Sequence, residues 1–393
     1  MLALDLPDPD PELKQHSAAL AARIASEIRA QGPIPFQRYM ELALYAPGLG
    51  YYAAGLRKFG RHGDFITAPE LGEVYAECLA EAIAPLLRTL DDPVVMELGA
   101  GTGALAADLW LALEQRRATP ARYLILERSA DLRERQIAHL KLRVPHAMPR
   151  IAWLDQPPEA RFDGVLFGNE VLDALPCARF EATGEGLREV YIDHGAQGFA
   201  EQLLAPRPEV QAALAHLQAE LGTPWPKAYR SELVPELAAW METVTRPLRS
   251  GLALFVDYGY PRREYYSAER HMGTLICHYR HRAHGDPYWY PGLNDLSAFV
   301  DFTAVAEAGR DAGLSLCAFD SQAGFLESAG IGRVYQDLSH RSERERMRLV
   351  QQIKRLMLPG EMGERFKLIG LQRGLEPEQL PQAFQLPGQR HRL

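Results

Sequence analysis

Three alternating glycines preceded by an acidic residue are the part of this sequence whose residue types and spacing point most directly to chemistry. They lie in the segment Glu97-Leu98-Gly99-Ala100-Gly101-Thr102-Gly103. Glycine suits a turn that needs positive φ angles and a close approach of the backbone to a ligand. A short apolar run from Val94 precedes the segment, and a helical pattern from Leu105 to Glu114 follows it. Strand, glycine turn and helix together predict the opening βα unit of a nucleotide-cofactor domain.

The glycine turn fits two classes of cofactor. Gly99-x-Gly101-x-x-Ala104 satisfies the dinucleotide fingerprint, in which a pyrophosphate lies at a helix N-terminus. Glu97-x-Gly99-x-Gly101-x-Gly103 resembles the first motif of class I S-adenosylmethionine-dependent methyltransferases. The third glycine and the acid favour the second interpretation. A tight turn that holds no ligand is the alternative for the motif taken alone.

Two further acids follow predicted strands of the same sheet. Glu127 directly follows the predicted strand Ala121–Leu126, about 20 residues beyond the glycines. An acid at the end of the second strand holds ribose hydroxyls in nucleotide-binding domains. Asp155 follows the predicted strand Ile151–Leu154, and its carboxylate is suited to accept a hydrogen bond from an adenine amino group. The alternative for Glu127 is an exposed acid at a helix start.

The fourth predicted strand, Phe162–Phe167, leads into Asn169, Glu170 and Asp173. In an open parallel sheet, ligands bind outside the carboxyl ends of the strands, near the point where the strand order reverses. The first and fourth strands flank that crevice, so these three side chains are expected to point toward the reacting atoms. Capping of a helix is the alternative role for Asn169.

The segment Gly63-Asp64-Phe65-Ile66-Thr67-Ala68-Pro69-Glu70 combines glycine, proline, acids and an aromatic residue. Long loops of this kind tend to be functional. Pro69 is expected to open a helix that runs to about Leu87. Turn and cap formation are the alternative roles for Asp64 and Thr67.

Composition excludes some classes of protein. The 393 residues are 47% hydrophobic and 24% charged, with a net charge of −8 and no long basic run, which argues against a nucleic-acid partner. Neither a signal peptide nor an apolar run of membrane-spanning length is found. The four cysteines are widely separated, which favours a reducing compartment, so a cytoplasmic protein is expected. Four histidines between His271 and His284 lack the spacing of a metal site, so no metal is expected.

Several blocks in order along the chain resemble the MidA family, which includes the mitochondrial complex I assembly factor that acts as a protein arginine methyltransferase. The similarity covers roughly Pro35 to Arg373, with Asn294–Ser297 as a mild departure. The blocks are Tyr39-Met40, Gly50-Tyr51-Tyr52, Gly63 to Glu70, Glu97 to Gly103, Asn169-Glu170-Val171-Leu172-Asp173-Ala174-Leu175-Pro176, Val256-Asp257-Tyr258-Gly259 and Val300-Asp301-Phe302-Thr303.

The resemblance implies an α/β fold: a Rossmann-like, seven-stranded class I methyltransferase sheet whose last strand lies antiparallel between the fifth and sixth. It implies an N-terminal helical extension and helical insertions. The expected divisions are a helical and loop region, 1–92, covering the cofactor site; a methyltransferase domain, 93–373; and a loosely ordered tail, 374–393. The domain would carry insertions at about 181–248 and 320–360, the first with a helix over Gln202–Leu221.

The resemblance also implies S-adenosylmethionine as the cofactor. By position, Glu97 and the loop of Gly99, Ala100, Gly101, Thr102 and Gly103 would hold its methionine part, and Glu127 its ribose. The segment with Asp64, Phe65 and Thr67 would close over the cofactor. Asp155 and Asn169 complete the expected cofactor contacts.

The predicted activity is methyl transfer to a guanidino nitrogen of an arginine in a partner protein. Arginine stays protonated in proteins, and carboxylates match its planar fork, so Glu170 and Asp173 are the expected catalytic pair. The family points to a bacterial member whose substrate is unidentified, with a respiratory-complex subunit as one candidate. An assembly factor that binds the cofactor without turnover is the first alternative, and a nicotinamide-dependent dehydrogenase the second. The oligomeric state is not predicted.

Overall fold

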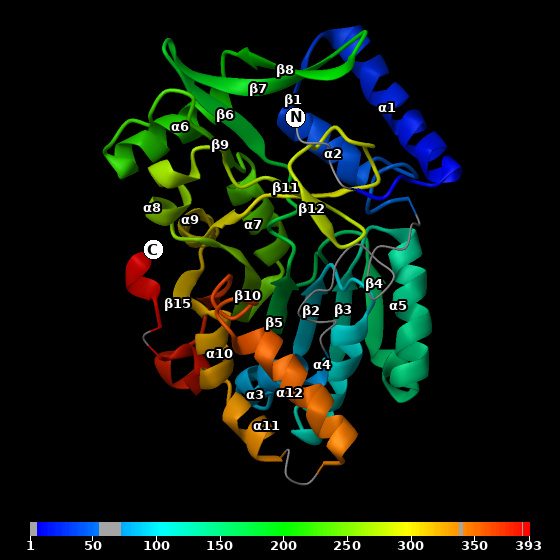
Figure 1. Cartoon of the computed structure of the whole chain (residues 1–393). Coiled ribbons are helices and arrows are strands. Elements are labelled where there is room, and N and C mark those ends of the chain that lie inside the picture. The colour runs from blue at the N-terminus through cyan, green and yellow to red at the C-terminus, as the bar shows by residue number, and fades with distance from the viewer. Residues whose placement is uncertain (1–5, 55–71, 338–340, 387) are drawn as a thin grey trace. The chain divides into compact units, whose positions relative to one another are not determined.

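The computed structural model describes residues 6–54, 72–337, 341–386 and 388–393 (Figure 1). The chain divides into two compact units. The first unit comprises Met1–Phe65, Asp173–Glu236 and Arg262–Asp301. The second unit comprises Ile66–Leu172, Leu237–Pro261 and Phe302–Leu393. The expected N-terminal region 1–92 is therefore shared between the two units.

The second unit is built on seven strands, in the order β15-β16-β10-β5-β2-β3-β4. Neighbours from β10 to β4 are parallel, whereas β16 is antiparallel to both β10 and β15. This confirms the predicted fold, including a last strand that lies antiparallel between the fifth and sixth. The strands are β2 (Val94–Leu98), β3 (Arg122–Leu126), β4 (Ile151–Leu154), β5 (Phe162–Asn169), β10 (Leu248–Tyr260), β15 (Ser315–Ser321) and β16 (Phe366–Arg373).

The helices of the second unit shield this sheet from water. All five residues of β2 are buried, as expected for a parallel strand covered on both faces. Val95 and Val165 belong to one core with apolar residues of α3 and α4, such as Ile83 and Leu109. The helices are α3 (Glu73–Leu87), α4 (Ala104–Gln115), α5 (Ala130–Arg143), α7 (Leu237–Thr245), α9 (Phe302–Asp311), α10 (Gln322–Ser328), α11 (Ile331–Asp337) and α12 (Glu343–Met357).

The residues after Gly374 differ from the expected loosely ordered tail. They include short 3₁₀ helices at Pro377–Gln379, Gln382–Phe384 and Arg390–Arg392. Phe384 is fully buried in the core of the second unit and stacks on Phe325, with ring centroids 6.0 Å apart. The tail is rich in proline and glutamine, but the burial of Phe384 and the 2.7 Å hydrogen bond that Gln389 N donates to Phe319 O hold it against the second unit.

The first unit contains two antiparallel sheets. One has the order β1-β7-β6-β9, with β8 also paired to β7, and the other has the order β12-β11-β13. The strands of the two sheets are β1 (Ile34–Pro35), β6 (Ala178–Thr183), β7 (Gly186–Gly195), β8 (Gly198–Leu204), β9 (Arg230–Leu233), β11 (Ile276–Tyr279), β12 (Arg282–His284) and β13 (Asp295–Ser297), and β14 (Val300–Asp301) belongs to neither sheet. The helices are α1 (Pro11–Gln31), α2 (Phe36–Tyr45), α6 (Pro208–Leu221) and α8 (Arg262–Tyr265), with a 3₁₀ helix at Ala268–Arg270.

The insertion at about 181–248 is thus only partly helical, and the helix predicted over Gln202–Leu221 begins later. Gly195 pairs with Gly198 to close a hairpin between β7 and β8. Because β8 extends to Leu204, residues 202–204 form a strand and not the start of the helix. Pro206 lacks the N–H that a helix interior needs, and α6 begins at Pro208, where a first-turn proline is tolerated.

Candidate active site

The glycine turn joins β2 to α4 as the sequence predicts. Gly99, Gly101 and Gly103 have φ angles of 63°, 53° and 80°, in the left-handed region that side chains disfavour. A Cβ atom added to Gly101 would meet no atom of the described residues within 4 Å, so within that part of the chain open space lies beside the middle of the turn. Ala100 is buried, and Thr102 is half-buried. The turn therefore has both the backbone shape and the free space that a bound cofactor requires.

Glu97 is buried in the strand that leads into this turn. Its side chain is 3% exposed, and the Tyr123 hydroxyl on β3 donates a 2.7 Å hydrogen bond to its Oε2. Burial raises the pKa of Glu97 to about 7, while the tyrosine hydrogen bond opposes the shift and the nearby Glu127 adds to it. A cation placed beside this carboxyl group would favour its ionised form. The position is therefore suited to the charged methionine part of the cofactor.

Glu127 stands at the exit of β3 with both oxygens hydrogen-bonded. Its Oε1 accepts from the backbone N–H of Ser129 at 2.9 Å, and its Oε2 accepts from Gln136 Nε2 at 3.0 Å. Gln136, a fully buried residue of α5, is not among the site residues predicted from the sequence, and Trp153 is predicted only as part of its strand. The available signal was an uncharged polar residue among the apolar positions of α5.

Asp155 follows β4 and lies at the surface, with 75% of its side chain exposed. It forms an ion pair with Arg133, whose Nη2 also donates to the main-chain oxygen of Glu127 at 3.1 Å. Asp155 is thus connected to the Glu127 segment through Arg133. Contact between Asp155 and an adenine group stays a prediction.

Asn169 ends β5, and Glu170 follows it in an unusual conformation. Glu170 has a φ angle of 55°, and its N–H donates to Val256 O on β10 at 2.8 Å. Asn169 Nδ2 donates to Glu170 Oε1 at 2.9 Å, while the buried Oδ1 of Asn169 has no hydrogen-bond partner among the described residues. A non-glycine residue held at positive φ costs roughly 1–3 kcal/mol, and such residues cluster at functional sites.

Asp257 holds the backbone that follows Glu170. It is fully buried at the end of β10, and its Oδ2 accepts from the N–H of Leu172 at 2.9 Å, while its Oδ1 accepts from the N–H of Tyr258. Burial, together with the nearby Glu170, raises the pKa of Tyr75. The Glu170 segment is therefore fixed by β10 and lies near an un-ionised tyrosine.

The remaining predicted site residues fall elsewhere. The division between the units lies between Leu172 and Asp173. In the first unit Asp173 is buried, and its main-chain oxygen accepts from Ala298 N at 3.0 Å. The pairing of Glu170 with Asp173 therefore stays a prediction. Asp64, Phe65 and Thr67 lie outside the described residues.

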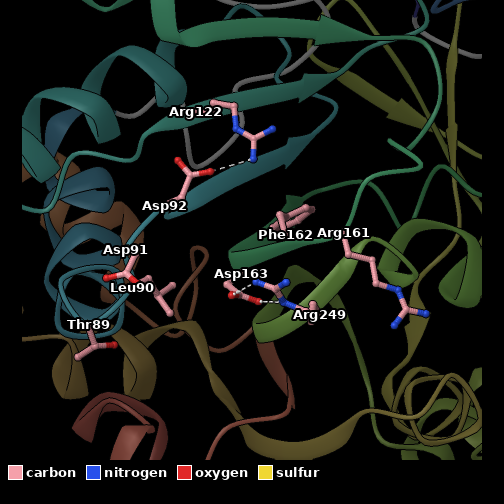
Figure 2. Close-up of a pocket in the computed structure, with 9 residues that line it drawn as sticks. All are labelled: Thr89, Leu90, Asp91, Asp92, Arg122, Arg161, Phe162, Asp163 and Arg249. Atoms are coloured by element: carbon pink, nitrogen blue, oxygen red, sulfur yellow. Dashed lines mark hydrogen bonds and ion pairs between the residues drawn. The ribbon is translucent and has the colours of Figure 1, made fainter.

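A polar pocket of about 260 Å³ lies at the opposite ends of the strands (Figure 2). Arg122 and Phe162, among its lining residues, begin β3 and β5. Figure 2 shows two ion pairs among its charged residues: Arg122 with Asp92 at 3.3 Å, and Arg249 with Asp163 through hydrogen bonds of 2.8 and 2.5 Å. Ligands of parallel sheets bind at the carboxyl ends of the strands, so this pocket is not the cofactor site.

The described residues also bear on a metal site and on a membrane-spanning helix. In that part of the chain, no group of three or more His, Cys, Asp or Glu side chains is placed to hold a metal ion. Over the same residues, no helix is both long and apolar enough to cross a membrane.

The residues at the carboxyl edge of the sheet fit S-adenosylmethionine. Within residues 6–54, 72–337, 341–386 and 388–393, open space faces Gly101, and Oδ1 of Asn169 has no hydrogen-bond partner and can accept one from a ligand. Glu97 and Glu127 offer buried carboxylates for an ammonium group and for ribose hydroxyls.

Comparisons with known proteins agree with this fit. Residues 78–319 match a family described as S-adenosyl-L-methionine-dependent methyltransferases. A COG1565 superfamily member from Burkholderia thailandensis, with S-adenosyl-homocysteine bound in its crystal structure, is 42% identical with a TM-score of 0.91. The match covers 99% of this chain and all of that one.

Curated relatives carry a more specific name. The chain is 28% identical to protein arginine methyltransferase NDUFAF7, mitochondrial, from Danio rerio, over 90% of this chain and 86% of that protein. The protein of the same name from Homo sapiens is also 28% identical, over 88% of this chain and 81% of that one. The matches confirm the predicted cofactor and the resemblance noted in the sequence.

Proposed function

Because the chain belongs to the family of S-adenosyl-L-methionine-dependent methyltransferases, we propose that it methylates a guanidino nitrogen of an arginine in a partner protein. The observation that carries the choice of arginine is Glu170, a carboxylate held at positive φ where β5 ends. Relatives named as protein arginine methyltransferases support the same choice. A subunit of a respiratory complex is the first candidate for the partner.

In this proposal the chain's own residues hold the cofactor at the carboxyl edge of the sheet. Glu97 and the loop from Gly99 to Gly103 hold the methionine part, and Glu127 holds the ribose hydroxyls. Asn169 Oδ1 accepts a further hydrogen bond, and Asp155 is assigned to the adenine side. Asp64, Phe65 and Thr67 are assigned to covering the cofactor. When bound, S-adenosylmethionine supplies an electrophilic methyl group on a positively charged sulfur.

Glu170 and Asp173 bind and orient the acceptor arginine. A guanidinium ion stays protonated near neutral pH, and its planar fork pairs with carboxylates through two parallel hydrogen bonds. Carboxylates at this position concentrate electron density on the nitrogen that reacts and stabilise the positive charge that the product retains. Positioning and fixed charges supply the rate enhancement. The proton released from the nitrogen leaves through this acidic pair.

The hypothesis is tested by separating cofactor binding from transfer. Glu170→Gln keeps the shape of the side chain but removes its charge. We expect the affinity for S-adenosyl-homocysteine, measured by calorimetry, to stay within about threefold, while methyl transfer falls at least 100-fold. Glu327→Gln, an exposed glutamate of α10, is the matched control. Full transfer by Glu170→Gln would show that Glu170 has no such role.

An assembly factor that binds the cofactor without turnover is the second candidate function. The observation that favours it is a first unit with its own sheets and core, large enough to dock a partner. A variant that binds no cofactor but still supports assembly of the partner complex would favour this alternative over methyl transfer. The alternative prediction of a nicotinamide-dependent dehydrogenase is wrong, because the chain belongs to a family of methyltransferases.

The cytoplasm of a bacterium is the proposed location. The cysteines Cys78, Cys177, Cys277 and Cys317 are free and buried, which suits a reducing compartment. Fractionation of the source cells, with immunodetection of the protein, tests this part of the proposal.

A further inference from the structure

A single buried amide joins three segments around the glycine turn. Gln136 Nε2 donates to Gly101 O and to Glu127 Oε2, both at 3.0 Å. Its Oε1 accepts from Trp153 Nε1 on β4 at 2.9 Å. The side chain is fully buried, so water does not compete for these hydrogen bonds. The amide of α5 therefore bridges the turn after β2, the acid after β3 and the ring on β4.

We propose that Gln136 is the positioning residue of the cofactor site: it holds the Glu127 carboxylate and the Gly101 carbonyl in the arrangement that binds the adenosyl half of S-adenosylmethionine. The inference rests on the proposed role of Glu127 in holding the ribose. It does not depend on which nitrogen or protein accepts the methyl group.

The hydrogen bonds around Glu127 explain how this positioning works. Ser129 N occupies Oε1 and Gln136 Nε2 occupies Oε2, so the carboxylate cannot rotate without losing a bond. A carboxylate oxygen can accept more than one hydrogen bond, so an oxygen that is already bonded to the protein can also accept from a ribose hydroxyl. A carboxylate fixed in advance binds a diol more tightly, because no side-chain freedom is lost when the ligand arrives.

The third glycine of the turn is explained by the same residue. A Cβ atom on Gly103 would lie 3.3 Å from the Cα of Gln136, tighter than ordinary contact. Gly103 therefore lets the start of α4 approach α5 closely enough for Gln136 to reach Gly101. The glycine motif and the buried amide form one arrangement, although they are separated in the sequence.

The rival explanation is that Gln136 only satisfies buried polar groups and stabilises the fold. Gln136→Glu distinguishes the two, because it puts a carboxyl group about 3 Å from Glu127. Two carboxylates at that separation share one proton, and the pair loses it as the pH rises. If Gln136 acts through Glu127, the affinity of this variant for the adenosyl group must change with pH in a way that the wild-type affinity does not.

The experiment measures the dissociation constant of S-adenosyl-homocysteine at pH 6 and pH 9 for the full chain and its variants. We expect Gln136→Met to weaken binding by about 10- to 100-fold, the loss associated with hydrogen bonds to a charged group. For Gln136→Glu, the ratio of its dissociation constant to that of wild type should be about tenfold larger at pH 9 than at pH 6. Trp153→Phe, which removes one donor to the amide, should weaken binding by about threefold at both pH values.

Controls keep the outcomes separable. Gln351→Leu changes an exposed glutamine of α12 and should leave the affinity unchanged. Circular dichroism establishes that each variant is folded, and if Gln136→Met is not, Gln136→Glu and Trp153→Phe still decide the question. A ratio for Gln136→Glu that is the same at both pH values would overturn the proposal. Glu127→Ala distinguishes failure of the ribose role of Glu127 from failure of the role of Gln136. Normal binding by Glu127→Ala would reject the ribose role itself. Weak binding by Glu127→Ala together with normal binding by Gln136→Met would reject only the role of Gln136.

Discussion

Glu97 is a carboxyl group that the fold buries beside a tyrosine hydroxyl, at the end of the strand that leads into the cofactor turn. Burial raises its pKa from 4.5 to about 7, so in the absence of a nearby cation it holds a proton across much of the acidic range. The acid of the glycine motif is therefore sensitive to whatever charge the cofactor brings.

The shifted pKa of Glu97 predicts a pH-dependent stability. The folded protein binds a proton that the unfolded chain releases between pH 4.5 and about 7, so the free energy of unfolding falls as pH rises through this window. Glu97→Gln removes the titrating group. We therefore expect the variant to gain stability relative to wild type from pH 5 to pH 8, by about 3 kcal/mol at most. Thermal unfolding without cofactor measures the difference, and a constant difference across this range would contradict the assignment.

Gly101 offers a test of the open space beside the turn. Its φ angle of 53° makes valine costly there, by roughly 1–3 kcal/mol, although an added Cβ atom would meet no atom of the described residues within 4 Å. Gly101→Val should therefore remain folded, lose a few degrees of Tm and fail to bind S-adenosyl-homocysteine.

Gly222 supplies the matched control for Gly101→Val. It has a φ angle of 67° at the end of α6, and a Cβ atom there would also meet nothing within 4 Å. Gly222→Val should show a similar loss of Tm with normal cofactor affinity. Normal affinity in Gly101→Val would place the cofactor away from the turn.

At the scale of the elements, the side chain of Arg116 links α4 to α3 through ion pairs. Arg116, at the end of α4, forms ion pairs with Glu77 at 2.7 Å and Glu81 at 3.0 Å on α3. Its Nη1 also donates to Ala112 O at 2.9 Å. The neighbouring glutamates raise the pKa of Arg116 against the opposing effect of burial, so it stays charged.

Removing the ion pairs of Arg116 should destabilise the fold without changing the residues of the cofactor site. We expect Arg116→Met to lower the free energy of unfolding by about 1–2 kcal/mol, because several partly buried hydrogen bonds to carboxylates are lost together. Urea denaturation measures the effect. Arg344→Met, which removes an exposed arginine of α12, should change stability by less than about 0.5 kcal/mol. Equal effects in the two variants would mean that the ion pairs of Arg116 contribute nothing.

The elements of the second unit could be predicted from sequence because their signals are strong. The apolar runs at Val94 and Phe162 are short, uninterrupted and followed by turn residues, so each predicts a buried strand. The strands of the first unit carry no such signal. On β7, Glu189 is fully buried, and Arg207 donates to its carboxylate through Nε at 3.0 Å and through the backbone N–H at 2.9 Å. A buried ion pair looks like a solvated surface in the sequence, since burial depends on a distant partner.

The candidate site shows the same division. The glycines of the turn and the acids at the strand ends can be predicted from the sequence, because their residue types and spacing are typical of a known local geometry. Gln136 does not, since its role depends on contacts with Gly101, Glu127 and Trp153 that only the folded sheet brings together. The conformation of Glu170 was equally hidden, because a positive φ at a non-glycine residue is imposed by the surrounding structure.

At the scale of the whole molecule, each unit has a core and sheets of its own, and the glycine turn belongs entirely to the second. The second unit contains the methyltransferase sheet order and the acids Glu97 and Glu127 that are proposed to hold the cofactor. The chain also carries the first unit, which is rich in β-structure. We propose that this first unit recognises the partner protein that carries the acceptor arginine.

The most direct test of methyl transfer to arginine is a labelling experiment. Purified protein is incubated with S-adenosylmethionine carrying a labelled methyl group and with lysate of the source organism, and Gly101→Val is the parallel control. We expect label in a discrete protein, recovered as methylarginine after hydrolysis and absent from the control. Label recovered in another residue, or no transfer by protein that binds the cofactor normally, would contradict it.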